Sequence, residues 1–390
     1  MCGIAGFLHG GLDPAAAEQR LLAMTGRLVH RGPDAGGCWL ASGAGVALGH
    51  RRLSVVDLSA AGAQPMSSHD GRFVIVYNGE IYNHNRLRRE LDGEVATAWR
   101  GHSDTEVLLE AIVNWGLVPA LERVDGMFAF ALYDQRDGVL HLARDRFGEK
   151  PLYYGRVGDA LVFASELKAI KALPGFRGEV DREALAGFLR FGYVPAPRSI
   201  YVGISKLPAA SLLSIPCGSP SLPRPQAYWS AVGAALGARG APFEGSSADA
   251  ATALDSLLRD AVGCRMEADV PLGAMLSGGI DSSTVVALMQ AQRSDRVRTF
   301  SIGSTEPGYD EAVHARAVAE HLGTDHTELY VSAGDALAVI PRLPELYDEP
   351  FADSSQLPAF LVSQLARQHV TVALSGDAGD ELFGGYNRYF

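Results

Sequence analysis

The first residues of the chain could perform acyl-transfer chemistry. The sequence begins Met1-Cys2-Gly3, and removal of Met1 would leave Cys2 with both a thiol and a free α-amine. A free thiol has a pKa near ~8.5 and an α-amine has one near ~8, so the amine can take the thiol proton at neutral pH. Cys2 is therefore a candidate nucleophile, and Gly3 would leave room for a substrate carbonyl. The alternative is that a cysteine beside the start methionine is accidental and buried.

Two further stretches carry groups that could bind an anion. Arg51 and Arg52 lie within the strand-like run 46–57, where a charged group costs desolvation energy unless an anion meets it; a solvated strand edge is the alternative. Asn78-Gly79 follows an apolar strand run and first of all predicts a hairpin turn. The functional alternative is that the Asn78 amide and the Gly79 backbone N–H are two donors suited to an oxyanion.

A glycine loop in the second half of the chain predicts a phosphate site. The apolar strand 270–276 runs into Ser277-Gly278-Gly279-Ile280-Asp281-Ser282-Ser283, and we expect a helix over 284–292. At such a junction, free backbone N–H groups and the helix dipole converge on an anion. The loop lacks the GxxxxGK[ST] pattern of a Walker A motif, and an ordinary strand-to-helix turn is the alternative.

An acidic glycine loop follows another apolar strand, 370–374. Asp377, Asp380 and Glu381 lie within five residues of one another, and their like charges repel unless a cation or ligand meets them. Mg²⁺ together with ATP phosphates would do so. A solvated acidic turn is the alternative, which the apolar residues on both sides disfavour.

Length and composition indicate a globular protein of about two domains. The chain has 390 residues, of which 47% are hydrophobic and 20% are charged. No apolar run approaches the ~18 residues of a membrane span, and no basic, apolar leader precedes Cys2, so we expect a cytoplasmic protein without a membrane partner. The net charge of −11 disfavours a nucleic-acid partner, and four cysteines without CxxC spacing disfavour a zinc site and disulfides.

The pattern of elements predicts an α+β domain followed by an α/β domain. Hairpin signals such as Asp137-Gly138 predict antiparallel sheets up to about residue 165, and a helix begins at Ser103-Asp104, either of which could be its N-cap. The segment from 192 to 245 is rich in Pro and Gly, which indicates a connection between two domains. Beyond it, strands alternate with helices as in a parallel sheet. The predicted boundaries are 2–205 for the first domain, 206–248 for the connection and 249–390 for the second domain, incomplete at its C-terminus.

Six short motifs follow one another in the first half of the chain. They are Met-Cys-Gly-Ile-Ala-Gly-Phe at 1–7, His-Arg-Gly-Pro-Asp at 30–34, Arg-Leu-Ser-Val-Val-Asp at 52–57, Asn-Gly-Glu-Ile-Tyr-Asn at 78–83, Ser-Asp-Thr-Glu at 103–106 and Arg-Asp-Arg-Phe-Gly-Glu-Lys-Pro-Leu-Tyr-Tyr at 144–154. Together they closely resemble the glutaminase domain of glutamine-hydrolysing asparagine synthetases. The resemblance implies an N-terminal-nucleophile fold, in which two antiparallel sheets lie between helices.

The resemblance also implies a role for each candidate residue of the first domain. Cys2 would attack the carboxamide of glutamine, and Asn78 and Gly79 would hold the tetrahedral oxyanion. The second arginine of the pair, Arg52, would bind the substrate α-carboxylate, and Asp104 would bind the α-ammonium. The implied glutamine-binding set is completed by Leu53, Val55 and Glu80.

The second half resembles the synthetase domain of the same family, through Ser-Gly-Gly-x-Asp-Ser and the acidic loop. The resemblance implies that Asp281 and Asp380 share Mg²⁺ and that Asp377 controls proton transfer when ammonia attacks. Ala378 stands where a glycine is common in the family. The implied ATP-binding residues are Leu276 and Ile302 beside the adenine, Ser277, Gly278, Gly279, Asp281 and Ser282 around the pyrophosphate, and Ser375 and Gly376.

The predicted function is a glutamine-dependent amidotransferase, most simply an asparagine synthetase that uses glutamine, aspartate, ATP and Mg²⁺, with a homodimer as one candidate assembly. Family chains continue past this point with a helical portion that includes a lysine, for which no residue here is a match. Asp-Glu-Pro-Phe-Ala-Asp-Ser-Ser at 348–355 resembles a branch with other acceptors, so the alternative substrate is another carboxylate, such as a sugar uronate or a natural-product precursor. A non-catalytic glutamine- or nucleotide-binding regulator is the alternative from a different class.

Overall fold

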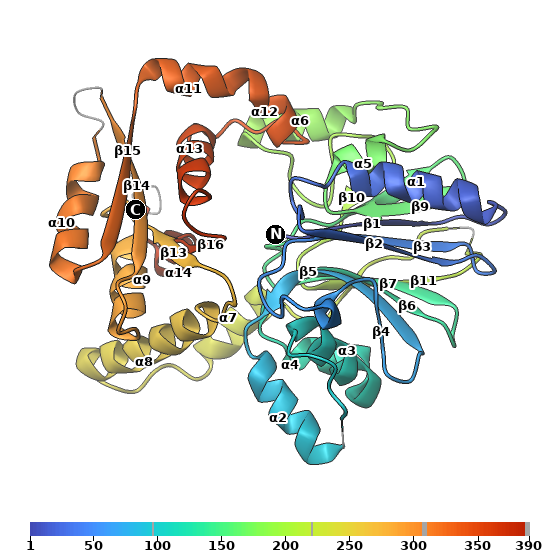
Figure 1. Ribbon diagram of the computed structural model, residues 1–390, viewed down its shortest axis with the longest axis horizontal. Helices are drawn as coiled ribbons and strands as arrows, with labels where there is room; N and C mark the ends of the chain where they lie inside the picture. Colours follow the sequence, from blue (N-terminus) through green and yellow to red (C-terminus); the bar gives the residue numbers. More distant parts are fainter. Residues whose placement is uncertain (96, 220, 306–309, 387–390) are drawn as a thin grey trace. The chain divides into compact units, whose positions relative to one another are not determined.

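The computed structural model describes residues 1–95, 97–219, 221–305 and 310–386, and it divides into two compact units (Figure 1). Unit 1 consists of Met1–Pro242 and Tyr347–Ala352, and unit 2 consists of Phe243–Leu346 and Asp353–Phe390. The chain therefore leaves unit 2 for one short segment and then returns to it. None of the helices in the described residues combines the length and the apolar character that a bilayer crossing requires.

Unit 1 contains two six-stranded antiparallel sheets that pack face to face (Figure 1). In the first sheet, the order of strands is β10 (Ile204–Lys206), β8 (Tyr153–Val157), β9 (Ala160–Ala164), β1 (Gly3–Leu8), β3 (Val46–Arg52) and β2 (Ala35–Ala41). In the second, it is β12 (Gln226–Ala227), β11 (Ser211–Pro216), β7 (Val139–Arg144), β6 (Gly126–Asp134), β5 (Phe73–Ile81) and β4 (Met66–Ser67). The first strand of the chain is thus an interior strand, and Cys2 immediately precedes it.

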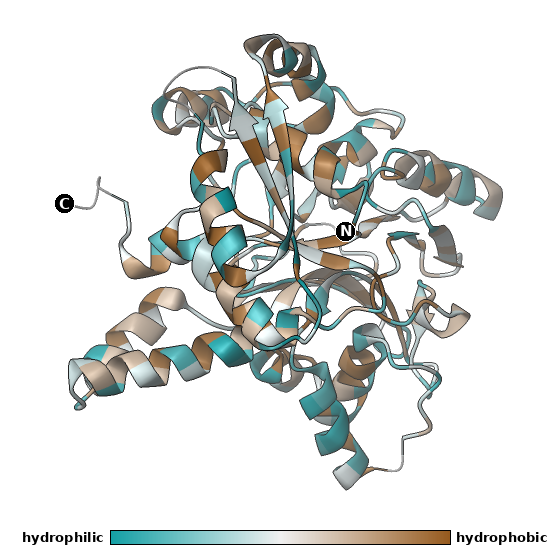
Figure 2. Cartoon of the chain, turned by 60° about the vertical axis from the view of Figure 1, so that its left-hand side comes forward, coloured by the Kyte–Doolittle hydropathy of each residue, from teal (hydrophilic) through white to brown (hydrophobic). Residues whose placement is uncertain are grey.

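Helices cover the outer face of each sheet, so unit 1 has three hydrophobic layers. The first sheet carries α1 (Pro14–Gly26), α5 (Leu167–Lys171) and α6 (Arg182–Phe191), and the second carries α2 (His84–Glu94), α3 (Asp104–Trp115) and α4 (Leu117–Arg123). A short 3₁₀ helix, η1, spans Ala60–Gly62. In Figure 2 hydrophobic and hydrophilic residues alternate along the helices and strands, as in elements that bury one face. This helix–sheet–sheet–helix arrangement confirms the predicted fold of the first domain.

Part of the predicted connection at 206–248 belongs to unit 1. Strand β11 pairs with β7 inside the second sheet, and its residues Leu213 and Ile215 are fully buried. The prolines and glycines that indicated a crossing bound this strand, and a helix, α7 (Ala231–Arg239), follows it. The prediction was wrong here because a short strand of six residues between turn signals has little periodicity of its own.

Unit 2 contains a parallel four-stranded sheet with helices on both faces, which confirms the predicted α/β domain. The order of strands is β15 (Asp325–Val331), β14 (Arg298–Ser304), β13 (Leu272–Met275) and β16 (Val372–Leu374). One face packs against α8 (Ser247–Arg265), α9 (Ile280–Ala291) and α10 (Ala312–Leu322), and the other packs against α13 (Gln356–Ala366). The remaining elements are α11 (Ala333–Val339), η2 (Ile340–Arg342), α12 (Leu343–Leu346) and α14 (Gly379–Phe383). The order of strands reverses between β13 and β16, and such a switch point is where open parallel sheets bind ligands.

Candidate functional sites

The Cys2 thiol lies at the end of an interior strand of unit 1. Its Sγ donates to the backbone oxygen of Leu53 at 3.6 Å, and the residue is partly buried. Burial raises the pKa of the Cys2 thiol above its ordinary value, while the amino terminus and the Arg52 guanidinium act against that rise. A buried thiol of this kind needs a base to become a nucleophile, and a freed α-amine on the same residue is such a base.

The backbone around Cys2 is held by residues to which the sequence analysis gave no role. The Arg31 side chain donates from Nε to the Cys2 carbonyl oxygen at 2.8 Å and from Nη1 to Glu166 Oε1 at 2.8 Å. A Cβ on Gly3 would lie 2.9 Å from Leu28 Cβ, so the glycine makes room for a core leucine, and its role beside a substrate carbonyl stays a prediction. The signal for Arg31 was present in the His-Arg-Gly-Pro-Asp motif at 30–34.

Asn78 is a buried amide whose polar atoms find no hydrogen-bond partner in the part of the chain that the structure describes. Strand β5 continues through Asn78 and Gly79 to Ile81, paired residue by residue with β6, so the hairpin-turn interpretation was wrong. Asn78 is 1% exposed, and neither its Oδ1 nor its Nδ2 is bonded within the described residues. Leaving such a group unsatisfied costs about 1–3 kcal/mol, so a bound ligand or a buried water is expected to meet it. A Cβ on Gly79 would lie 2.3 Å from the Met127 oxygen, so only glycine fits between the strands.

A buried cation and a buried anion lie near the thiol. Arg52 is 8% exposed and donates from Nη1 to the Ser59 oxygen at 3.0 Å and from Nη2 to the Asp57 oxygen. The charges of Arg52 and Asp104 both act on the pKa of the Cys2 thiol, so both groups lie within electrostatic range of it. Because neighbouring residues of a strand point to opposite faces, Arg51 lies toward α1 and donates to the Thr25 oxygen at 3.4 Å. This supports the choice of Arg52 over Arg51.

Asp104 does not cap α3, since Ser103 is the N-cap of that helix. Its Oδ2 accepts from the Tyr77 hydroxyl at 2.9 Å and from the Ile81 N–H at 2.9 Å. Burial raises the pKa of Asp104, and these hydrogen bonds oppose the rise. The sequence analysis missed Tyr77, because the apolar residues that precede it indicated a side chain of the hydrophobic core. The other predicted residues are Leu53, which accepts from the thiol, and Val55 and Glu80, which are partly buried after β3 and on β5.

A cavity of 430 Å³ in unit 2 collects nearly all of the predicted nucleotide-site residues. Its lining includes Leu276, Ser277, Gly279, Asp281, Ser282, Ile302, Ser375, Gly376, Asp377 and Asp380. Gly278 instead forms the turn, with a φ of 80°, and a Cβ there would lie 2.7 Å from the Ala315 nitrogen. The sequence analysis missed the apolar wall from Met275, Phe300 and Val362, whose side chains read as ordinary strand and helix core.

The glycine loop and the acidic loop pack directly against each other in this cavity. A Cβ on Gly376 would lie 2.6 Å from the Ser282 nitrogen, and one on Gly379 would lie 2.3 Å from Asp281 Oδ2. Ser277 Oγ and Ser282 Oγ are 2.9 Å apart, so two hydroxyls meet in front of the helix α9. Ala378 has a φ of 76°, the left-handed conformation that a glycine adopts freely.

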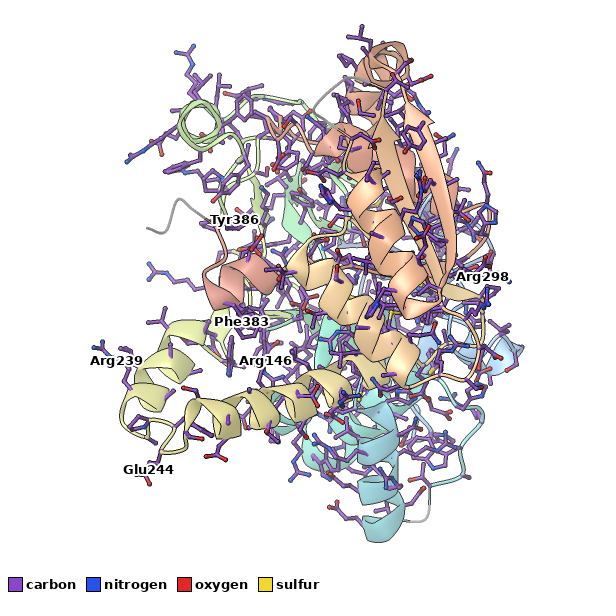
Figure 3. All side chains as sticks on the ribbon, turned by 90° about the vertical axis from the view of Figure 1, so that its left-hand side faces the viewer. Arg146, Arg239, Glu244, Arg298, Phe383 and Tyr386 are labelled. Atoms are coloured by element: carbon purple, nitrogen blue, oxygen red, sulfur yellow. The ribbon has the colours of Figure 1, made fainter. Side chains whose placement is uncertain are left out.

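The acidic groups of the cavity suit a cation that is shared with phosphates. No group of three or more His, Cys, Asp and Glu side chains among the described residues could hold a metal alone. Asp281 and Asp380 both line the cavity, and a set of one or two carboxylates completed by phosphates and water is the usual environment of Mg²⁺. Glu381 points elsewhere: it accepts from the hydroxyl of Tyr386 at 3.0 Å, beyond the end of α14 (Figure 3).

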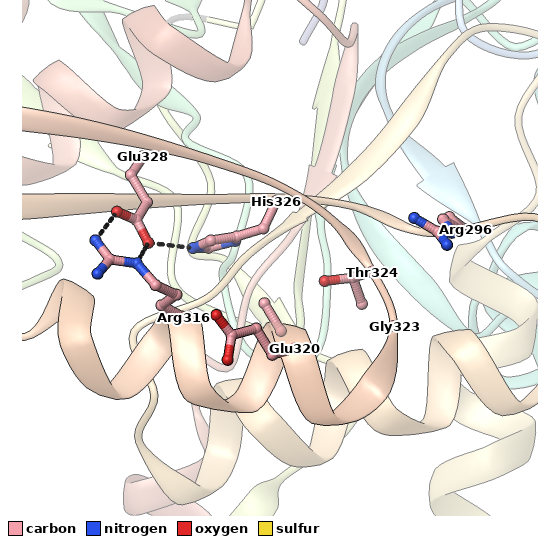
Figure 4. Close-up of a pocket in the computed structure, with 8 residues that line it drawn as sticks. Arg296, Arg316, Glu320, Gly323, Thr324, His326 and Glu328 are labelled. Carbon is pink, nitrogen blue, oxygen red and sulfur yellow. Dashed lines mark hydrogen bonds and ion pairs between the residues drawn. The ribbon is translucent and has the colours of Figure 1, made fainter.

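A second cavity of unit 2, of 620 Å³, lies beside α10 and β15 and contains no predicted residue (Figure 4). Arg316 forms a two-bond ion pair with Glu328, at 2.9 and 2.5 Å. His326 donates or accepts at Thr299 Oγ1 over 2.8 Å and lies 3.5 Å from Glu328 Oε1. The charges of Arg316 and Glu328 in this cavity therefore neutralise each other.

Comparison with known proteins assigns a family model to each half of the chain. A family model described as a glutamine amidotransferase domain matches residues 1–229, and one described as asparagine synthase matches residues 253–390. Asparagine synthetase [glutamine-hydrolyzing] 1 of Bacillus subtilis is 36% identical over 100% of this chain, and a provisionally named asparagine synthetase of Methanocaldococcus jannaschii is 36% identical over 99%.

The chain spans 59% of the length of the Bacillus relative and 76% of the archaeal one. Among solved structures, glutamine phosphoribosylpyrophosphate amidotransferase from B. subtilis is similar, with 17% identity, a TM-score of 0.44, and coverage of 84% of this chain and 65% of that one. On the two family models and the sequence relatives, the chain belongs to the glutamine-hydrolysing asparagine synthetase family.

Proposed function

We propose that the chain acts as a glutamine-dependent asparagine synthetase: it releases ammonia from glutamine at Cys2, and unit 2 activates the β-carboxylate of aspartate with ATP. Two observations support the proposal: the buried Asn78 amide has no hydrogen-bond partner among the described residues, and the charges of Arg52 and Asp104 both act on the pKa of the Cys2 thiol. A thiol, an oxyanion donor, a cation and an anion are the groups that hydrolysis of an amino-acid amide requires.

In unit 1, the substrate would be oriented by its charged ends. Arg52 would bind the α-carboxylate of glutamine and Asp104 its α-ammonium, which leaves the carboxamide facing Cys2. Once Met1 is removed, the α-amine takes the thiol proton and the thiolate attacks the carboxamide carbon. The oxyanion is stabilised by the Asn78 amide, with the Gly79 N–H as the second donor. Ammonia leaves, and water then hydrolyses the thioester to glutamate.

In unit 2, the glycine loop and the start of α9 would bind the phosphates of ATP. Ser277, Ser282 and the loop N–H groups are donors to pyrophosphate, and Leu276 and Ile302 offer apolar contact to the adenine. Asp281 and Asp380 would hold Mg²⁺, which neutralises phosphate charge when bound. The acceptor carboxylate attacks the α-phosphorus and releases pyrophosphate, and ammonia then displaces AMP to form the amide. Asp377, which lines the cavity, would take the proton that ammonia loses.

The glutaminase half of the proposal is tested by glutamate release from glutamine. We expect the purified chain, with Met1 shown to be absent by intact mass, to release glutamate, and Cys2→Ala to abolish that release. Cys38→Ala is the matched control, because Cys38 is an exposed free thiol. Release that survives in Cys2→Ala, or none from the unaltered chain, would contradict the proposal.

The synthetase half is tested by product formation from MgATP and ammonia. We expect aspartate to stimulate formation of AMP and pyrophosphate, and mass spectrometry to identify asparagine. A panel of other carboxylic acids, uronic acids included, tests the acceptor. AMP formation that depends on another carboxylate and not on aspartate would replace the proposed acceptor.

A further inference from the structure

A short segment within the sequence of the second domain is anchored in unit 1. Tyr347–Ala352 lies inside the asparagine synthase match at 253–390, yet it packs as part of unit 1. Glu349 accepts from the Ile200 N–H at 2.7 Å and from the Tyr153 hydroxyl at 3.3 Å, and it forms an ion pair of 2.5 Å with Lys206. Its side chain is 11% exposed. These contacts make the segment a fixed part of unit 1. The first residues of the 348–355 motif therefore have a structural role in unit 1, in addition to any role in the choice of acceptor carboxylate.

The neighbouring residue, Asp348, is bound to the start of helix α5. Its Oδ2 accepts from the Lys168 N–H at 3.2 Å, and its Oδ1 lies 3.6 Å from Lys168 Nζ. The Asp348 side chain is 8% exposed, so little water competes for it. Lys168 Nζ also lies 2.8 Å from Glu166 Oε2, and Lys168 is therefore held between two carboxylates.

Glu166 connects this lysine with the catalytic cysteine. Its Oε1 accepts from Arg31 at 2.8 Å, and the same Arg31 side chain donates to the Cys2 carbonyl oxygen at 2.8 Å. His30 Nε2 lies 2.9 Å from Glu166 Oε2 on the more exposed side. A continuous line of charged contacts thus runs from Asp348 through Lys168, Glu166 and Arg31 to the backbone of Cys2.

Once Met1 is removed, no preceding residue holds Cys2 in place. The position of Cys2 then depends on this line of charged contacts. Its backbone is then fixed by strand β1 on one side and by the Arg31 contact to its carbonyl oxygen. Both the α-amine and the thiol are attached to the Cys2 backbone. The Arg31 contact, which orients that backbone, therefore also affects where these two groups lie. A displacement of well under an ångström in a nucleophile is enough to lower a rate, since attack requires near-contact alignment.

We propose that Asp348 is a positioning residue for glutamine hydrolysis, acting on Cys2 through Lys168, Glu166 and Arg31. The inference rests on the proposed role of Cys2 as the nucleophile. The segment is covalently continuous at both ends with residues of unit 2, at Leu346 and Asp353. A residue from the synthetase part of the sequence thereby supports the glutaminase nucleophile.

The test is a double-mutant cycle on glutamate release. Asp348→Asn keeps a carbonyl oxygen for the Lys168 N–H but removes the charge, and we expect kcat to fall about tenfold, the effect of one charge-assisted contact, with KM within about twofold. Glu166→Ala should lower kcat at least as much, and Asp348→Asn should add nothing in that background. Lys168→Arg should retain kcat, whereas Lys168→Met should repeat the loss. The matched control is Asp353→Asn, an exposed carboxylate of the same motif.

A second readout does not depend on glutamine turnover. We expect the rate of Cys2 alkylation by iodoacetamide, followed by mass spectrometry across pH, to change in Asp348→Asn and not in Asp353→Asn. Multiplicative losses in the double variant, an effect on KM alone, or an unchanged alkylation profile would overturn the inference. If Asp348→Asn does not fold, the two Lys168 variants replace it. Retained kcat in Lys168→Arg together with a loss in Lys168→Met would then support the inference, and equal kcat values in both would overturn it. If the unaltered chain releases no glutamate, the proposed function fails, and the alkylation profile alone decides the positioning role.

Discussion

Replacing Asn78 with leucine should stabilise the protein while it removes glutamine hydrolysis. Leucine has the same branching and number of heavy atoms as asparagine, and it leaves no unpaired polar atom at a position that is 1% exposed. Relief of an unsatisfied buried amide is worth about 1–3 kcal/mol, from which imperfect packing of the larger methyl groups subtracts. A net gain of about 1 kcal/mol would raise Tm by roughly 2–4 °C. Loss of an oxyanion donor should lower kcat by about 10²–10³-fold.

The assay combines calorimetric unfolding with glutamate release, and a partnered asparagine is the control. Asn83 donates to the Arg123 oxygen at 2.9 Å and accepts from the Asp125 N–H at 2.9 Å. Asn83→Leu breaks both bonds and should lower Tm with little effect on kcat. If Asn78→Leu lowers Tm as Asn83→Leu does, the amide has a structural partner. If it hydrolyses glutamine at the unaltered rate, Asn78 is not an oxyanion donor. Either result would refute the reasoning.

Three further predictions concern charge, backbone and metal. The contacts of Glu166 with His30, Arg31 and Lys168 outweigh burial and lower its pKa to about 2, so its stabilising contribution is complete above pH 4.5 and is lost as pH falls toward 2. The difference in unfolding free energy between the unaltered chain and Glu166→Gln should shrink by about 3 kcal/mol over that window, as denaturant titrations at several pH values would show. Ala378→Gly should raise the unfolding free energy by about 0.5–1 kcal/mol, since a left-handed alanine costs more than the entropy of a glycine, and thermal unfolding that is lower than in the unaltered chain would contradict this. Asp281→Asn should abolish most of the Mg²⁺ dependence of ATP affinity in calorimetric titrations, and an unchanged dependence would exclude Asp281 as a ligand.

Local chemistry carried most of the functional prediction. A cysteine after the start methionine, a glycine loop between an apolar strand and a helix, and a cluster of carboxylates are each readable within a few residues, because the groups that do the chemistry are neighbours in the chain. The same holds for the alternation of strands and helices that indicated a parallel sheet in unit 2. Asp281 and Asp377 line one cavity because the carboxyl ends of parallel strands share one edge.

Pairing between distant strands decided what the local pattern left open or misread. Asn78-Gly79 has the sequence of a turn, yet β6 pairs with it along its whole length and keeps it extended, since tertiary contacts outweigh local turn propensity. Strand β11 is a strand only because β7 lies beside it. The place of Asp348 in unit 1 depends on Lys168, which lies 180 residues earlier in the chain. The amino-acid sequence by itself therefore determined which chemical groups are available and in what order, and the tertiary structure decided which of them meet, because burial and partner choice arise from contacts between residues far apart in the chain.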